Sequence, residues 1–86
     1  MITPREKPVI HYPCPWSYRI IGTHEGLMRM AIRALVGEDA YDLERGNTSR
    51  TGKYVSLKLT LTVRDEAHRL GIARTLLRED VIRYVL

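Results

Sequence analysis

The sequence predicts a two-layer α+β domain in which two helices cover one face of an antiparallel sheet. Its clearest strand pattern is residues 54–63, YVSLKLTLTV, where polar and aliphatic side chains alternate at every position. One apolar and one polar face is typical of an antiparallel sheet that is covered on one side only. Two other stretches, residues 23–37 and 66–78, carry aliphatic side chains at helical spacing and supply the cover.

The composition agrees with one small ordered domain. The chain has 86 residues, of which 44% are hydrophobic and 28% charged, and its aromatic residues are one Trp and five Tyr. A chain of this length supports a single domain, and the core must be mainly aliphatic. Fourteen Lys and Arg against ten Asp and Glu leave a net charge of +4, which permits polyanion binding without requiring it.

The N-terminal segment differs from the rest of the chain. Residues 1–15 hold all four prolines, which predicts an extended or mobile arm before a domain over residues 16–86. No apolar run has the length of a membrane span or the form of a signal peptide, so we expect a cytoplasmic protein without a membrane role. The single cysteine, Cys14, agrees with a reducing compartment, and with His11 it offers too few ligands for a metal site. We expect neither a metal nor a cofactor.

The first half of the domain reads as a strand, a helix and a short strand. Residues 16–22, WSYRIIG, are rich in aromatic and β-branched side chains and stop at a glycine, as a strand does. Thr23 is placed to cap the helix that follows, and Gly37 is placed to end it. In residues 40–45, AYDLER, apolar Tyr41 and Leu43 alternate with Asp42 and Glu44, which predicts a short strand. The apolar side chains that give the helix its predicted inner face are Leu27, Met28, Ala31, Ile32 and Leu35.

The second half reads as a strand, a helix and a strand. A long hairpin connection leads into residues 54–63, with turn chemistry from Asn47, Ser49 and Gly52 and a positive φ at the last of these. Asp65 is placed to cap a helix from Glu66 to about Arg78, whose apolar side chains are Leu70, Ile72, Ala73, Leu76 and Leu77.

Two features complete this half. Gly71 costs the helix about 1 kcal/mol relative to Ala, which predicts a tertiary reason for a glycine there. Residues 80–86, DVIRYVL, are β-branched and form the last strand.

The resulting order is β-α-β-β-α-β, which is the split βαβ or ferredoxin-like arrangement with sheet order 4-1-3-2. If Arg19 and Arg83 point to the open face, Tyr54 and Lys58 join them there. The side chains then predicted to point to the core are Tyr18, Ile20, Ile82 and Tyr84. The open face is therefore predicted to be basic and partly aromatic.

The stretch GNTSRTGKY resembles a phosphate-binding loop but fails its requirements. Such a loop needs G-x-x-x-x-G-K-[ST] between a strand and a helix, because backbone N–H groups and the helix N-terminus form the anion site. Here five residues separate Gly46 from Gly52 where the motif has four, Tyr54 follows Lys53, and the segment joins two strands. A hairpin connection is the better interpretation.

The residues argue against two other functions, base stacking by an RNA-recognition domain and nucleophilic catalysis. The third strand of an RNA-recognition domain carries stacking aromatics on its open face, but TGKYVSLKL offers only Tyr54 there, so weak, salt-sensitive RNA or nucleic-acid binding remains the alternative. A serine nucleophile needs a base, and the spacing of His11, His24 and His68 directs none of them toward a partner. We therefore expect no enzyme and no catalytic residue.

Three blocks of the sequence resemble the YbeD-like family of small bacterial proteins. They are YPCPWSYRIIG at residues 12–22, SRTGKYVSLKLTL at residues 49–61 and DVIRYVL at residues 80–86. The matching positions are Pro13, Pro15, Trp16, Ser17, Tyr18, Arg19 and Gly22; Ser49, Gly52, Tyr54, Ser56, Leu57, Leu59, Thr60 and Leu61; and Asp80, Ile82, Arg83, Val85 and Leu86. The blocks fall in order across nearly the whole chain.

The resemblance implies a ferredoxin-like fold similar to ACT-type regulatory domains and a proposed role in regulating lipoate metabolism. It supplies no catalytic or cofactor residue. We expect a non-enzymatic regulatory or interaction module whose partner is a protein, a small anionic metabolite or a second copy of the chain. The candidate binding residues, on the open face and the hairpin loop, are Arg19, Ser49, Arg50, Lys53, Tyr54, Ser56, Lys58 and Arg83. An equal alternative is that these residues form a solvated basic surface or line a homodimer contact.

Overall fold

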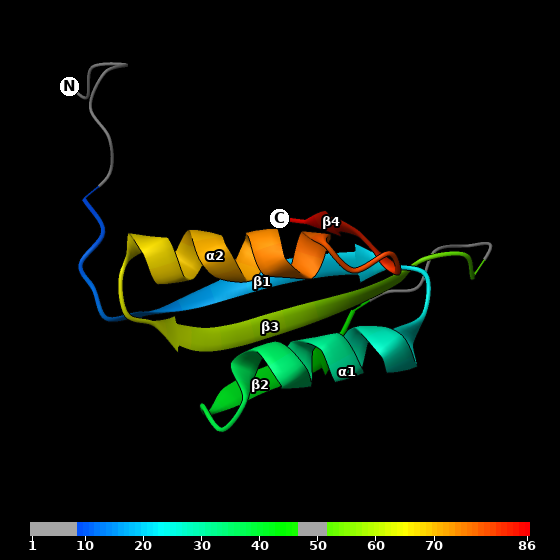
Figure 1. Ribbon diagram of the computed structural model, residues 1–86, viewed down its shortest axis with the longest axis horizontal. Helices are drawn as coiled ribbons and strands as arrows, with labels where there is room; N and C mark the ends of the chain where they lie inside the picture. The colour runs from blue at the N-terminus through cyan, green and yellow to red at the C-terminus, as the bar shows by residue number, and fades with distance from the viewer. Residues whose placement is uncertain (1–8, 47–51) are drawn as a thin grey trace, which may run out of the picture.

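The computed structural model describes residues 9–46 and 52–86, and it has the predicted βαββαβ order (Figure 1). The strands are antiparallel and lie in the order β2-β3-β1-β4, which confirms the predicted sheet. The two long strands, β1 and β3, form the centre. The elements are β1 Cys14–Gly22, α1 Glu25–Val36, β2 Tyr41–Arg45, β3 Val55–Val63, α2 Glu66–Leu77 and β4 Ile82–Val85.

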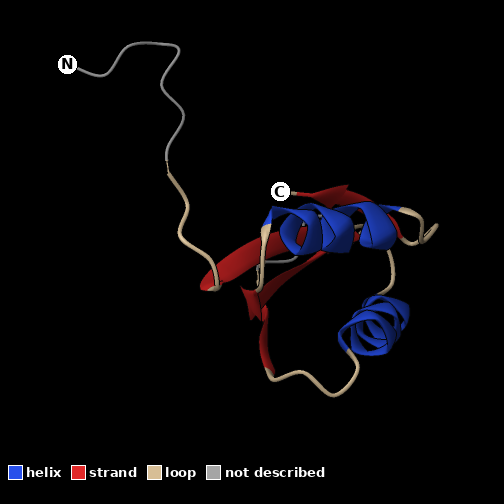
Figure 2. Cartoon of the chain, turned by 60° about the vertical axis from the view of Figure 1, so that its left-hand side comes forward, coloured by secondary structure: helices blue, strands red, loops and turns tan. Residues whose placement is uncertain are grey.

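The core lies between one face of the sheet and the two helices. In Figure 2, where α1 is seen almost end-on, the strands lie to one side of both helices. Every second side chain of β3 from Leu57 to Val63 is buried, as the alternation predicts. The buried core residues are Tyr18, Ile20, Met28, Ile32, Val36, Leu57, Leu59, Leu61, Val63, Ile72, Leu76 and Ile82. No helix within the described ranges is long and apolar enough to cross a membrane.

Helix α1 begins one residue later than the sequence predicts. The prediction that Thr23 caps it is wrong, because the Thr23 N–H donates to the Val81 carbonyl at 2.8 Å and so extends the sheet contact. His24 is the N-cap instead, with extended backbone, and its Nδ1 accepts from the Leu27 N–H at 3.1 Å. Gly37 ends the helix at φ 65°, as predicted.

The inner face of α1 differs from the predicted one at Leu27, whereas the other four predicted residues lie in the core or pack against it. Met28, Ile32 and Val36 are buried, whereas Leu27 is 46% exposed. Side chains four residues apart stack on one side of a helix, so the spacing of these three is that of a single buried stripe. The prediction that Leu27 faces the core is wrong, because the apolar pattern at the start of α1 is wider than the surface that the sheet covers.

Helix α2 has the predicted cap. The Asp65 Oδ1 accepts from the His68 N–H at 2.7 Å, and the His68 Nδ1 accepts from the Arg64 N–H at 3.0 Å, so the two side chains satisfy two backbone donors reciprocally. Ile72 and Leu76 are buried, whereas Leu77 is 48% exposed.

Gly71 lies in the interior of α2, and no close packing contact within the described ranges accounts for it. A Cβ built at Gly71 meets no atom within 4 Å in the described part of the chain. No close approach of another element therefore requires a glycine at this position.

Strand β4 contains an irregularity that moves one aromatic side chain. Ile21 pairs with Tyr84 and Gly22 pairs with Ile82, so Arg83 is an extra residue between these pairs. A bulge of one residue breaks the alternation of faces. Ile82 is buried, whereas Tyr84 is 58% exposed and lies opposite Ile21 on the open face. The prediction that Tyr84 points to the core is wrong for this reason.

The start of β1 is attached to α2 by an aromatic and cationic cluster. The strand begins at Cys14, two residues before the predicted start. The Arg69 guanidinium lies 4.6 Å from the centre of the Trp16 ring, and its Nε donates to the Tyr12 hydroxyl at 2.9 Å. The Tyr18 hydroxyl donates to the Arg69 carbonyl at 2.6 Å, and burial raises the pKa of this phenol. The first of the three sequence blocks thus holds α2 to the sheet.

Candidate functional site

The open face of the sheet is the surface on which the sequence places its candidate site. The registers assign to it alternate residues of all four strands, because the opposite set is buried against the helices. Its members are Asp42 and Glu44 from β2, Ser56, Lys58, Thr60 and Thr62 from β3, Ser17, Arg19 and Ile21 from β1, and Tyr84 from β4. The face is charged and partly aromatic, but β2 adds two carboxylates to it.

Two cations are neighbours at the centre of this face. Arg19 of β1 and Lys58 of β3 are directly opposite each other in the antiparallel register. Within residues 9–46 and 52–86 no ion pair is formed by either side chain, although Glu44 lies opposite Lys58 on its other side. Like charges directly opposite each other on a sheet are destabilising. An anion between them would remove that repulsion.

A shallow hollow of about 400 Å³ lies beside these cations. Its lining contains Arg19, Lys58 and Ser56 together with Glu44, which gives it two positive groups, a hydroxyl and one carboxylate. Arg45 also lines the hollow, but its Nε is 3.1 Å from the Glu25 Oε1, so this cation is already paired. The hollow can therefore hold a small anion through Arg19 and Lys58, with the hydroxyl of Ser56 as a further hydrogen-bonding group.

The structure brings together three of the predicted site residues and separates others. Arg19, Ser56 and Lys58 line the hollow. Arg83 is exposed in the β4 bulge and is not part of the lining.

The remaining predicted site residues belong to the hairpin connection. Tyr54 precedes β3 instead of lying within it, and the Lys53 ammonium lies 5.4 Å from the centre of the Tyr54 ring. Gly52 has the predicted positive φ of 70°. Ser49 and Arg50 lie outside the described residues, as does Asn47.

Glu44 belongs to this face and is absent from the residues predicted for it. The signal was present, because the predicted alternation of Tyr41 and Leu43 toward the core places Glu44 on the opposite side. The alternation within one strand does not specify how that strand pairs with the next, and it is this pairing that places Glu44 beside Lys58. In the described ranges, no group of three or more His, Cys, Asp or Glu side chains could hold a metal ion.

A small antiparallel sheet with two helices on one face and a charged open face defines a ferredoxin-like α+β domain. The chain belongs to the family described as "Protein of unknown function (DUF493)", whose model matches residues 7–86. This agrees with the YbeD-like resemblance at the level of the family.

Two proteins similar to this chain are uncharacterised bacterial proteins. An uncharacterised protein of Helicobacter pylori strain J99 is 32% identical over 81 residues, which is 94% of each chain. The uncharacterised protein Cj0253 of Campylobacter jejuni is 29% identical over 68 residues, covering 79% of this chain and 78% of the relative.

Solved structures have the same fold. A solution structure of protein HP0495 from H. pylori is similar to this chain with a TM-score of 0.84 and 28% identity, covering all of this chain and 94% of the other. A second solution structure of HP0495 gives a TM-score of 0.66 with 29% identity and full coverage of both chains. The fold is therefore shared across the length of the domain.

Proposed function

We propose that this protein is a non-enzymatic binding module that recognises a small anionic metabolite through the open face of its sheet. The observation that supports this most is the opposed pair Arg19 and Lys58, which has no ion-pair partner in the described part of the chain and adjoins the hollow. Arginine binds a carboxylate or phosphate through two parallel hydrogen bonds, and a neighbouring lysine adds a point charge.

The composition of the hollow supports binding without catalysis. Ser56 is its hydroxyl group, but no histidine is in the lining to act as a base. His24 and His68 each use Nδ1 to accept a backbone N–H at the start of a helix, on the opposite side of the sheet. These imidazoles have structural roles at the helix termini.

The choice of anion rests on the family resemblance and on the apolar side chains near Arg19. The YbeD-like resemblance links such proteins with lipoate metabolism, and lipoate is a small carboxylate with an apolar tail. Ile21 lies in the same hollow as Arg19, and Tyr84 is its cross-strand neighbour, so an apolar tail would have side chains to contact. Lipoate and octanoate are therefore the first ligands to test.

Single-stranded RNA is the alternative ligand. Tyr84 gives the open face an exposed aromatic ring, but Asp42 and Glu44 would repel a phosphate chain that crosses β2. Binding to RNA would weaken steeply with added salt, whereas a single carboxylate held by two cations would show a shallower dependence. The observations favour the small anion.

The test is a titration followed by backbone amide resonances and thermal stability. Lipoate, octanoate, inorganic phosphate and a single-stranded RNA are added to the full chain at low and moderate salt. Binding at the proposed site should shift amides around Arg19, Ser56 and Lys58 and raise the melting temperature.

Three variants decide whether the cations are responsible. Arg19→Ala and Lys58→Ala should each weaken binding about tenfold, because each removes a charge-assisted hydrogen bond. Arg74→Ala, which removes an exposed cation of α2, should leave binding unchanged. An equal loss in all three variants, or no saturable shift with any of these ligands, would exclude this site.

A further inference from the structure

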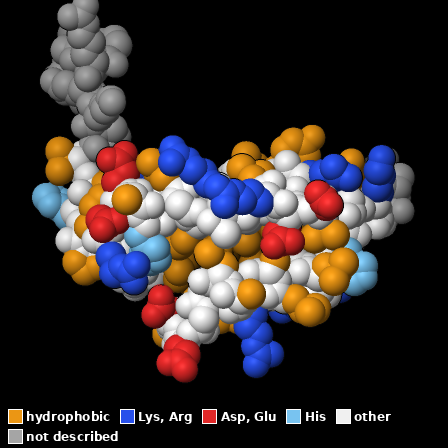
Figure 3. All heavy atoms as spheres, in the orientation of Figure 1, with side chains coloured by type: hydrophobic (Ala, Val, Ile, Leu, Met, Phe, Trp, Pro, Cys, Tyr) orange, Lys and Arg blue, Asp and Glu red, His pale blue; other side chains and the backbone are white. Residues whose placement is uncertain are grey.

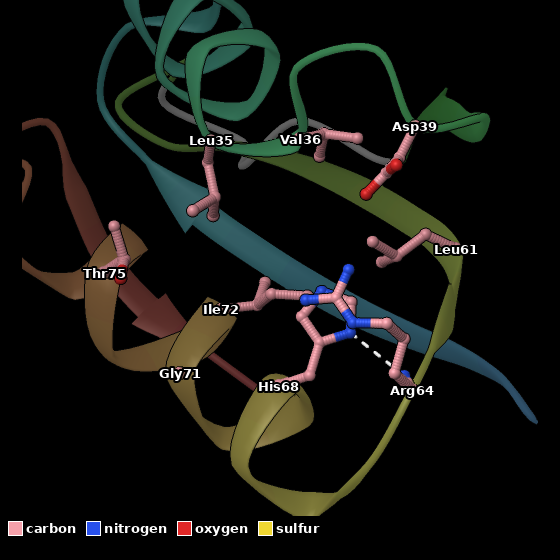
Figure 4. Close-up of a pocket in the computed structure, with 9 residues that line it drawn as sticks. All are labelled: Leu35, Val36, Asp39, Leu61, Arg64, His68, Gly71, Ile72 and Thr75. Carbon is pink, nitrogen blue, oxygen red and sulfur yellow. Dashed lines mark hydrogen bonds between the residues drawn. The ribbon is translucent and has the colours of Figure 1, made fainter. Parts of the chain in front are cut away.

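A second cavity lies on the other side of the sheet, between the two helices. It has a volume of about 270 Å³ and is formed by the end of α1, the end of β3 and one side of α2 (Figure 4). The sheet separates it from the hollow that contains Arg19 and Lys58, and the two sites share no residue. It is therefore a separate candidate site.

The inner wall of this cavity is apolar. Leu61 and Ile72 are only 5% and 4% exposed, and Leu35 packs against the same core. In Figure 4 the Leu35, Leu61 and Ile72 side chains point into the same space. Hydrophobic side chains also gather in the band between α1 and α2 in Figure 3, where acidic, basic and histidine side chains flank one end of it. An aliphatic group fits such a wall.

The rim of the cavity carries two opposite charges from different parts of the chain. Asp39 follows α1 and Arg64 follows β3, and both line the cavity. In Figure 4 the Asp39 carboxylate and the Arg64 guanidinium point into the space from opposite sides. The ion pairs formed by the described residues include neither of these side chains. The cavity thus presents one positive and one negative group that do not neutralise each other by direct contact.

His68 adds a hydrogen-bonding group of fixed character to the lining. Its Nδ1 accepts from the Arg64 N–H at 3.0 Å, drawn as the dashed line in Figure 4. A neutral imidazole whose Nδ1 accepts carries its proton on Nε2, so the ring has one N–H left to donate. The same hydrogen bond fixes the backbone at Arg64, where the guanidinium side chain begins.

Gly71 keeps one wall of this cavity open. It lines the cavity from the middle of α2, and a Cβ at this position would meet no atom within 4 Å. A glycine in a helix interior costs about 1 kcal/mol relative to Ala. No packing contact among the described residues requires the glycine, so the effect of the missing side chain on the structure is the open space in the cavity.

We propose that this cavity binds a small zwitterion with an aliphatic side chain, which is the chemistry of an apolar α-amino acid. Arg64 and the His68 Nε2–H receive the carboxylate, Asp39 receives the ammonium group, and Leu35, Leu61 and Ile72 contact the side chain. A simple carboxylate would leave the Asp39 carboxylate unneutralised beside a second negative charge. A simple amine, which is protonated, would leave the Arg64 guanidinium unneutralised beside a second positive charge. The zwitterion satisfies both charges at once.

The test compares four probes that differ by one group each. L-leucine has all three groups, 4-methylpentanoate lacks the ammonium, 3-methylbutylamine lacks the carboxylate, and glycine lacks the aliphatic chain. Each is titrated into the full chain, and backbone amide shifts are followed. Leucine should shift amides near Asp39, Arg64 and Gly71, leave those near Lys58 unchanged, and bind at least about tenfold more tightly than the other three.

Matched variants test the two charges. Asp39→Asn and Arg64→Gln should each weaken leucine binding about tenfold. Glu38→Gln and Arg74→Gln remove charges of the same sign from exposed neighbouring positions outside the cavity and should have little effect. Equal losses in the cavity and control variants would overturn the proposal.

Gly71→Leu tests the cavity itself. Leucine is a good helix former and the position has open space, so the variant should retain its helical circular dichroism and melt at or above the temperature of the parent while losing leucine binding. Unchanged binding in a folded Gly71→Leu variant would overturn the proposal. So would 4-methylpentanoate binding as tightly as leucine, or leucine at millimolar concentration producing no saturable shift.

Discussion

The same substitution at two glycines is expected to change stability in opposite directions. A Cβ at Gly22 would lie 2.2 Å from the Val81 carbonyl oxygen and 2.7 Å from the Met28 sulfur. The first of these atoms is backbone and cannot rotate away. Restoring a contact of 3.0 Å requires the backbones of β1 and the segment before β4 to separate by about 0.8 Å. Gly22→Ala therefore strains the place where the first and last strands join.

The cost of Gly22→Ala follows from two losses. Overpacking of a close-packed site costs about 1–3 kcal/mol. The separation also weakens the hydrogen bond from the Thr23 N–H to the Val81 carbonyl, now 2.8 Å, which is worth about 1 kcal/mol. The sum of about 2–4 kcal/mol is a large part of the roughly 4–13 kcal/mol expected for a domain of this size. The melting temperature should fall by about 10 °C or more.

Gly71→Ala is the control, because it makes the same chemical change where no atom lies within 4 Å. It should raise stability by about 1 kcal/mol through helix propensity alone. Urea unfolding of both variants, followed by circular dichroism, measures the shift in midpoint at constant slope. A Gly22→Ala protein as stable as the parent, or a destabilised Gly71→Ala protein, would refute the geometry from which these values derive.

Four further substitutions test the cap of α1 and the contacts that hold α2 to the sheet. Thr23→Ala should change the free energy of unfolding by no more than about 0.5 kcal/mol, whereas His24→Ala should lower it by about 1 kcal/mol because it removes the α1 cap. Equal effects of the two substitutions would contradict the observed cap. Burial raises the pKa of Tyr18 above 10, so the neutral phenol stabilises the folded state fully below that pH, and this stabilisation is lost as the pH rises through the folded pKa. Tyr18→Phe should therefore flatten the fall of the urea midpoint at alkaline pH. An unchanged fall would assign the alkaline loss of stability to another group. Arg69→Ala should alter Trp16 fluorescence and lower the melting temperature, because it removes the cation over the ring; a spectrum identical to the parent would contradict that contact.

The fold could be predicted largely from the sequence because its signals are local. The alternation in β3, the cap at Asp65 and the glycine that ends α1 each depend on a few adjacent residues. The two helices and four strands follow from such signals, and the right-handed connections between them leave little choice of sheet order. The predicted fold was confirmed for these reasons.

The candidate site could be predicted only in part. Arg19, Ser56 and Lys58 were placed correctly on the open face, because strand alternation alone assigns a face to each. The bulge that moves Tyr84 to that face has no marker in DVIRYVL, since a bulge depends on how β4 docks against β1. The cap at His24 was missed because the preceding threonine is the more usual capping residue.

The sequence by itself determined the order of the elements, the aliphatic core and the polar character of the uncovered face. Periodicity encodes these features, because each side chain faces the core or the solvent according to its position in a strand or helix. Only the tertiary structure decided which distant residues meet. Register set Arg19 against Lys58, and the packing of α1 beside α2 brought Asp39 opposite Arg64 across the cavity. Both arrangements join segments far apart in the chain, and no local sequence pattern specifies the distance between such segments.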